Sequence, residues 1–157
     1  MSTFNGLPAH VLFVHFIVVL APLTAVLAIL CAVWPAARQR LVWLVLALSL
    51  AVAVLTPLTT EAGEWLEHRV ERTALLHTHT ELGDTMIYFS AGLLLVAVLL
   101  AVLHLRSSRG KSVSTVLTAL AAVLAVVVGA ATVVQVYRIG DSGAKATWSH
   151  IPLTAPS

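Results

Sequence analysis

The residues most able to do chemistry are concentrated in one segment, Thr56–Asp84. This segment holds six of the seven acidic residues of the chain and three of its seven histidines. Imidazole and carboxylate groups bind zinc, manganese and iron, and imidazole also exchanges protons near neutral pH. The segment is therefore the first candidate for a functional site. These side chains are Glu61, Glu64, Glu67, His68, Glu71, His77, His79, Glu81 and Asp84.

The segments around this polar stretch are long and apolar. The chain has 157 residues, of which 59% are hydrophobic and only 10% charged, and its mean hydropathy is +0.97. A soluble domain carries about a quarter charged residues. A spanning helix needs about 20 mostly apolar residues, and four such runs are present, at about 9–34, 41–69, 79–105 and 113–137. We therefore expect an all-α fold, an integral membrane four-helix bundle that forms a single transmembrane domain over residues 1–157.

The second and third runs position the polar segment. Ser49, Ala53, Thr56, Thr60 and Glu64 follow each other at steps of three or four, which is one face of a helix. Small and hydroxyl residues are enriched where membrane helices pack closely. The pattern predicts a helix to about residue 69, bent at the proline at position 57, with the carboxylates at 61 and 64 and the imidazole at 68 near one side.

Capping chemistry predicts where the third span begins. Thr78 and Glu81 have the spacing of a capping box, in which each side chain bonds the backbone amide of the other. We therefore expect that span to start at about His79. The tail Arg138–Ser157 contains glycines and polar residues, including His150, and is expected to have little regular structure.

The charge distribution predicts the topology. The loop between the first two spans and the loop between the last two hold five basic residues and no acid, namely Arg38, Arg40, Arg106, Arg109 and Lys111. By the positive-inside rule these loops are cytoplasmic, and they also suit anionic lipid head groups. Both termini and Thr56–Asp84 then lie outside. The expected location is the bacterial cytoplasmic membrane, and the formal charge of +2 gives no reason to expect a nucleic-acid partner.

The histidines gather on the predicted outer side. Only His104 is expected on the inner side. His15 lies about 7 Å deeper than His10 along a helix, and Glu64 ends the small-residue face. Ionisable groups at membrane depth are costly and commonly functional. The outer histidines are His10, His15, His68, His77, His79 and His150.

Three kinds of site remain open from these residues. A divalent metal could be held by a set drawn from six side chains. A b-type haem could instead be clamped by His79 with either His15 or His10. A glutamate beside a histidine could form a quinone pocket or a proton path. Each side chain could also be a hydrogen-bonded packing residue or part of a solvated face. The six candidate metal ligands are His10, His15, Glu61, Glu64, His68 and His79.

Four short stretches resemble a known family. LPAHVLFVHFIVVLAPLTA, TTEAGEW, HTHTELGD and VYRIGDSGA resemble a large bacterial family of four-span membrane proteins classed as a domain of unknown function. Some of its members are fused to Rieske-type iron–sulfur domains, so the resemblance implies membrane redox chemistry. It also implies that His10, Glu64 and His79 belong to one site. The family pattern often begins His-Pro, whereas Val11 follows His10 here.

The sequence therefore leads to one principal functional hypothesis. The chain is expected to be a membrane redox component that binds haem, a metal or quinone at the outer His/Glu cluster, with a membrane redox partner or a second copy of itself. The alternatives are a structural or assembly subunit without a cofactor and a proton- or ion-conducting oligomer. No nucleophile–base pair or phosphate loop indicates a particular enzyme reaction.

Overall fold

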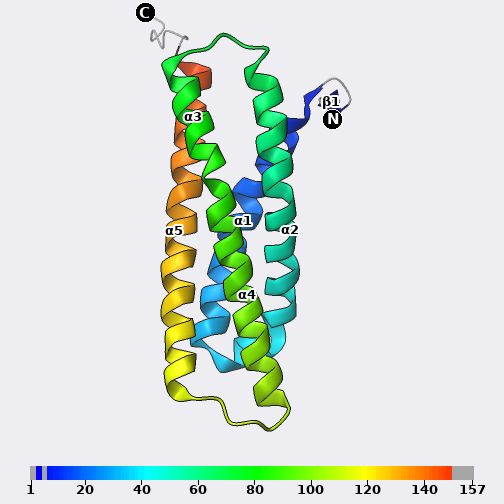
Figure 1. Cartoon of the computed structure of the whole chain (residues 1–157), viewed down its shortest axis with the longest axis vertical. Helices are drawn as coiled ribbons and strands as arrows, with labels where there is room; N and C mark the ends of the chain where they lie inside the picture. Colours follow the sequence, from blue (N-terminus) through cyan, green and yellow to red (C-terminus); the bar gives the residue numbers. More distant parts are fainter. Residues whose placement is uncertain (1–2, 5–6, 150–157) are drawn as a thin grey trace, which may run out of the picture.

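The computed structural model describes residues 3–4 and 7–149 and shows a bundle of long helices (Figure 1). A short antiparallel ladder, β1 (Thr3–Phe4) with β2 (Leu7–Pro8), precedes it. The two helices α3 and α4 follow each other as one interrupted rod, so the bundle has four helical columns. The helices are α1 (Ala9–Val33), α2 (Pro35–Glu67), α3 (Ala74–Asp84), α4 (Met86–Ser108) and α5 (Thr115–Trp148).

The four columns are long and apolar enough to cross a membrane. Helix α1 packs against α2 and α5, and α4 packs against the same two helices from the opposite side, so α1 and α4 are diagonal to one another. The β1–β2 ladder, the α2–α3 connection and the end of α5 lie at one end of the bundle, and the α1–α2 and α4–α5 turns lie at the other (Figure 1). The all-α transmembrane four-helix bundle is therefore confirmed. The outward orientation of the first end stays a prediction, and we call it the predicted outer end.

Two apolar clusters hold the columns together. The larger joins α1, α2, α4 and α5 in the predicted inner half, around Ala28, Val45 and Leu100. The smaller lies toward the predicted outer end and consists of Ile17, Ala21, Val52, Met86 and Val136. Small residues on α1 and α5 let these helices approach closely, as expected in membranes where packing drives helix association.

The buried hydroxyl groups are satisfied within their own helices. Each donates a hydrogen bond to a carbonyl three or four residues earlier, at 2.7–3.0 Å. In the part of the chain that the structure describes, every buried side-chain nitrogen or oxygen has a partner. The small-residue face of α2 is thus a packing face, as predicted, from Ser49 to Thr56. The seven residues are Thr24, Ser49, Thr56, Thr59, Ser90, Thr132 and Ser142.

Helix α2 begins six residues earlier than the predicted span. Its first residue is Pro35, and Trp34 alone connects it to α1. Proline suits the first helical position because its missing N–H has no partner there in any helix. The other end, at Glu67, is close to the predicted end at Arg69.

The predicted start of the third span is wrong. Helix α3 starts at Ala74, and the Oγ1 of its N-cap Thr73 accepts from the amide of Leu76 at 3.2 Å. Thr78 lies inside the helix and donates to the Ala74 carbonyl at 3.0 Å. The Glu81 carboxylate contacts His77 Nε2 at 3.4 Å rather than a capped amide. A threonine one turn upstream therefore provides the cap.

The prediction of an irregular tail is also wrong for Arg138–Trp148, which are helical. Helix α5 continues to Trp148 because α3 packs along it and supplies the tertiary contacts that the tail sequence does not reveal. An ion pair at spacing i,i+4 between Asp141 and Lys145, at 2.7 Å, supports the same helical turn. His150 lies outside the described residues.

Candidate functional site

The predicted outer end contains a partly open cavity of about 1030 Å³, which we call the vestibule. It forms because α3 packs on α5 and makes few contacts with α2, while α1 begins only at Ala9. Its walls come from α1, α2, α3 and α5, and the smaller apolar cluster closes its floor at Ile17 and Met86. Its polar lining includes His10, His15, Glu64, Glu67, His77, His79, Glu81 and Asp84, and its apolar lining includes Val11, Val14, Val18, Leu66, Val70 and Leu76.

His10 reaches from the start of α1 to α2. Its Nδ1–H donates to the carbonyl of Thr59 at 2.9 Å. The ring lies against Gly63, where a Cβ atom would come within 3.0 Å of both Nδ1 and Cε1. Because a carbonyl can only accept, the proton must sit on Nδ1. In the neutral ring the Nε2 of His10 is then the acceptor, and a neutral imidazole is the form that binds metals.

His79 reaches from α3 to α5 in the same way. Its Nδ1 lies 3.1 Å from the carbonyl of Ile139 and 3.1 Å from the Ser142 hydroxyl. That hydroxyl donates to the same carbonyl at 2.9 Å, so the three groups form one network. A Cβ at Gly143 would lie 2.9 Å from the His79 Cε1 atom. The Nε2 of His79 is therefore also left as the acceptor.

His10 and His79 are held by the same arrangement of a carbonyl and a glycine on the neighbouring helix. In each, the accepting carbonyl and the glycine are four residues apart on the neighbouring helix, as Thr59 with Gly63 and Ile139 with Gly143. Residues at this spacing lie on one helix face, so the ring can hydrogen-bond the carbonyl and cover the glycine together. The two ring centroids are 6.4 Å apart, with an interplanar angle of 83°. The structure thus brings together an imidazole from each of two columns that are diagonal in the bundle.

His15 and Glu64 line the vestibule without joining this pair. The Nδ1–H of His15 donates to the carbonyl of Val11 in its own helix, and its side chain is exposed. Glu64 is exposed as well and lies on the α2 wall, one residue beyond Gly63. The structure places both in the same cavity as His10 and His79.

Glu61 lies on the exposed surface of α2 and His68 is the exposed C-cap residue of that helix, and both are absent from the vestibule lining. His68 Nδ1 instead accepts from Arg72 at 3.4 Å. Among residues 9–149, no group of three or more His, Cys, Asp or Glu side chains is close enough to hold a metal ion. The structure therefore does not gather the six candidate metal ligands into one cluster.

The sequence reasoning missed the partners of the histidines. Gly63 and Gly143 were not singled out, nor were the carbonyls of Thr59 and Ile139. A signal was available in the stretches TTEAG and IGDSG, which share a glycine four residues after the accepting residue. Pairing each stretch with a histidine requires the three-dimensional packing, because the partners are 49 and 60 residues apart.

The fold and its four apolar spans define a multi-pass integral membrane protein. Comparison with protein families matches residues 6–155 to the family described as predicted membrane protein (DUF2231). This match covers almost the whole chain, and the chain belongs to that family, which confirms the resemblance found in the sequence. No curated protein matches the chain, and no solved structure matches it.

Proposed function

We propose that this protein is an electron-transfer component of the bacterial cytoplasmic membrane that binds a b-type haem between His10 and His79. The ring separation carries the proposal. Metal–imidazole bonds are about 2.0–2.1 Å long, so two imidazoles that held one haem iron between them would have ring centroids roughly 6 Å apart. The observed separation is 6.4 Å.

The hydrogen bonds of the pair also suit axial ligation. A metal-binding histidine usually donates its other ring N–H to a carbonyl or carboxylate, which fixes its tautomer and orientation. His10 and His79 both do so through Nδ1, to Thr59 and Ile139. Each imidazole is thereby oriented before any ligand binds.

Haem requires fewer protein ligands than a bare ion. The porphyrin would supply four nitrogen ligands to the iron, so His10 and His79 would be the only protein ligands needed to hold it. His10 and His79 are two imidazoles that lie close enough together to serve as these two ligands. The vestibule, at about 1030 Å³, is as large as the cavities that enclose cofactors, and apolar side chains such as Val14, Leu66 and Leu76 provide walls for a flat macrocycle. Covalent attachment through Cys-x-x-Cys-His is excluded because the chain has one cysteine, Cys31.

The bundle below the vestibule favours electron transfer over conduction through one copy. A proton or ion path needs polar groups or water across the hydrocarbon. The apolar cluster of Ile17, Ala21, Val52, Met86 and Val136 lies below the histidines. The buried hydroxyls beyond it are bonded to their own helices. A haem near one membrane surface could instead exchange electrons with a partner on that side.

The test is an absorption spectrum of the protein purified in detergent and reconstituted with hemin, recorded oxidised and dithionite-reduced. Wild-type protein should give the sharp reduced bands of six-coordinate haem, and His10→Ala or His79→Ala should abolish them. The matched control is His104→Ala, because His104 packs on Trp43 at the opposite end of the bundle. Absence of bound haem in the wild type, or unchanged bands in either variant, would overturn the proposal.

A further inference from the structure

We infer that the α1 side of the vestibule binds the head group of a lipid-soluble quinol, whose hydroxyl donates a hydrogen bond to Nε2 of His15. This goes beyond the proposed haem site and uses a different histidine. It stands on the depth of His15, the apolar wall beside it and the charges around the vestibule, so it does not require that haem binds to His10 and His79.

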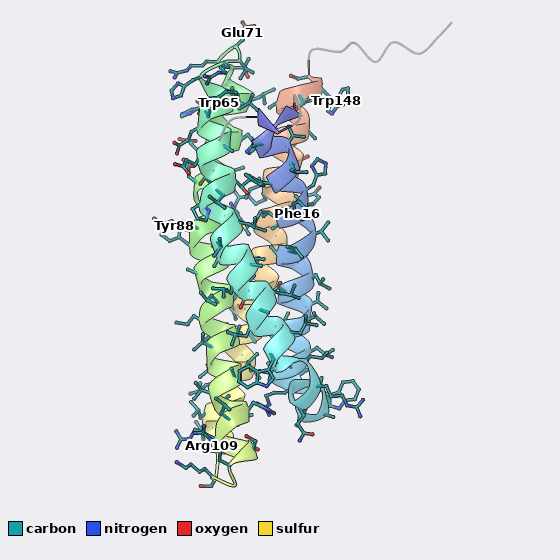
Figure 2. All side chains as sticks on the ribbon, turned by 90° about the vertical axis from the view of Figure 1, so that its right-hand side faces the viewer. Phe16, Trp65, Glu71, Tyr88, Arg109 and Trp148 are labelled. Carbon is teal, nitrogen blue, oxygen red and sulfur yellow. The ribbon has the colours of Figure 1, made fainter. Side chains whose placement is uncertain are left out.

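His15 lies where the bilayer begins. Twenty residues span about 30 Å of hydrocarbon, and twenty residues counted back from the end of α1 at Val33 finish at Val14. His10 is then outside this layer and His15 is at its edge. Its neighbour Phe16 is 49% exposed and lies at about the level of Tyr88, well below Trp148 along the long axis (Figure 2). An exposed imidazole at this level needs a polar partner.

The hydrogen bonding of His15 leaves a defined acceptor. Its Nδ1–H donates to the Val11 carbonyl, so in the neutral ring Nε2 carries the lone pair. A partner for Nε2 must therefore be a donor, and a hydroxyl group is suitable. Because His15 lines the vestibule, this donor can belong to a molecule inside it.

The wall beside His15 connects the vestibule to the lipid. Val11 and Val18 line the cavity and are also 41% and 43% exposed on the surface of α1. Val14 and Ile17 continue the same apolar wall. A ligand with an apolar tail can place its head group in the vestibule while the tail remains in the bilayer.

The charges of the vestibule select against anionic lipids. Its described lining contains carboxylates, among them Glu64, Glu67, Glu81 and Asp84, and no lysine or arginine. A phosphate would be repelled there. A quinol is neutral, carries two hydroxyl donors on a flat ring and has an isoprenoid tail. One hydroxyl can donate to His15 and the other to a carboxylate of the lining. A quinol therefore offers the hydrogen-bond donors and the neutral charge that the vestibule requires of a ligand.

The test is calorimetric titration of the purified protein, in neutral detergent and without oxygen, with decylubiquinol. Wild-type protein should bind it, and His15→Leu should weaken binding about tenfold, as expected for one lost hydrogen bond. Val18→Trp should also weaken binding, because it narrows the opening while His15 remains. His104→Leu is the control and should bind like the wild type.

The outcomes separate this inference from the haem proposal. The inference is overturned if decylubiquinol does not bind to the wild type, if His15→Leu binds it unchanged, or if phosphatidylglycerol displaces it. Haem spectra of the same variants report independently on His10 and His79. A protein that binds decylubiquinol through His15 but no haem would support this inference and refute only the haem site.

Discussion

His10 and His79 meet across the bundle although neither is held in place by the other's helix. Their ring centroids are 6.4 Å apart and their planes are nearly perpendicular. His10 is anchored by α2 and His79 by α5, through carbonyls at Thr59 and Ile139. The pair is therefore positioned by two separate helix contacts, α1 with α2 and α3 with α5. Disturbing either contact should move one imidazole and leave the other in place.

The glycines beneath the rings provide the first prediction. Gly63→Ala and Gly143→Ala each add a Cβ within about 3 Å of an imidazole, at the distances 3.0 and 2.9 Å. Overpacking a tight contact costs about 1–3 kcal/mol. Each variant should unfold at lower denaturant concentration in mixed micelles and should lose affinity for hemin.

Two other glycines serve as controls for this prediction. A Cβ at Gly83 or Gly140 would meet nothing within 4 Å, although both residues lie in helices and line the vestibule. Alanine is favoured over glycine inside a helix by roughly 0.5–1 kcal/mol. Gly83→Ala and Gly140→Ala should therefore be neutral or stabilising. Equal losses in all four variants would show that the rings are not what the glycines accommodate.

Hydropathy and charge were enough to predict the bundle but not the design of its site. Four apolar runs define four spans because the bilayer requires a fixed helix length. The positions of His10, Glu64 and His79 along the spans determine their depth, so the end of the bundle at which they lie was predictable, whereas the cavity that all three line was not. Their lateral neighbours depend on how the columns pack, and no residue pattern in a single chain specifies that α3 packs on α5 rather than α2.

The segment that was predicted to be irregular, Arg138–Trp148, also depends on packing that the sequence does not reveal. Arg138–Trp148 contains Gly140 and Gly143, which lower helix propensity. Contacts with α3 outweigh that preference, and Gly143 leaves the space against which the His79 ring packs. Gly143, one of the two residues that lowered the predicted helix propensity of this segment, is thus the one that allows the close helix contact.

The N-cap of α3 gives the second prediction. Thr73→Ala removes the hydroxyl that accepts from the Leu76 amide and should destabilise the protein by about 1 kcal/mol. Thr78→Ala changes a residue inside the helix and should cost little, because alanine is the better helix former. Thermal unfolding of the two variants distinguishes the caps. A larger loss of stability in Thr78→Ala than in Thr73→Ala would instead support the capping box of Thr78 and Glu81 that the sequence predicts.

The orientation of the bundle gives the third prediction. In a Cys31→Ala background, single cysteines at Glu71 and at Ser112 place a thiol in the exposed connection at each end. A membrane-impermeant maleimide should label Glu71→Cys in intact cells and Ser112→Cys only after the cells are opened. The basic residues in the loops near Ser112 are the physical reason, because such loops are retained in the cytoplasm. The reverse labelling pattern would place the vestibule inside.

The interruption between α3 and α4 gives the fourth prediction. Gln135 of α5 is 4% exposed, and its amide donates to the Leu82 carbonyl at 3.2 Å and to Thr85 Oγ1 at 2.7 Å. Thr85 also donates to the Leu82 carbonyl at 2.7 Å. Three groups thus share one network at the residue where the third column is interrupted. Gln135→Met keeps much of the side-chain volume but removes both bonds, and should cost about 1–3 kcal/mol.

A double-mutant cycle identifies this network as the cause. Thr85→Val keeps the side-chain shape and removes the hydroxyl that Gln135 bonds. Residues that share a hydrogen bond show interaction energies of about 0.5–3 kcal/mol, so the double variant should lose less stability than the two single variants together. The unfolding free energy in mixed micelles measures each step. Strict additivity would mean that the contact between Gln135 and Thr85 does not stabilise the interruption. A measurable coupling would mean that the hydrogen bond from α5 stabilises the interruption between α3 and α4.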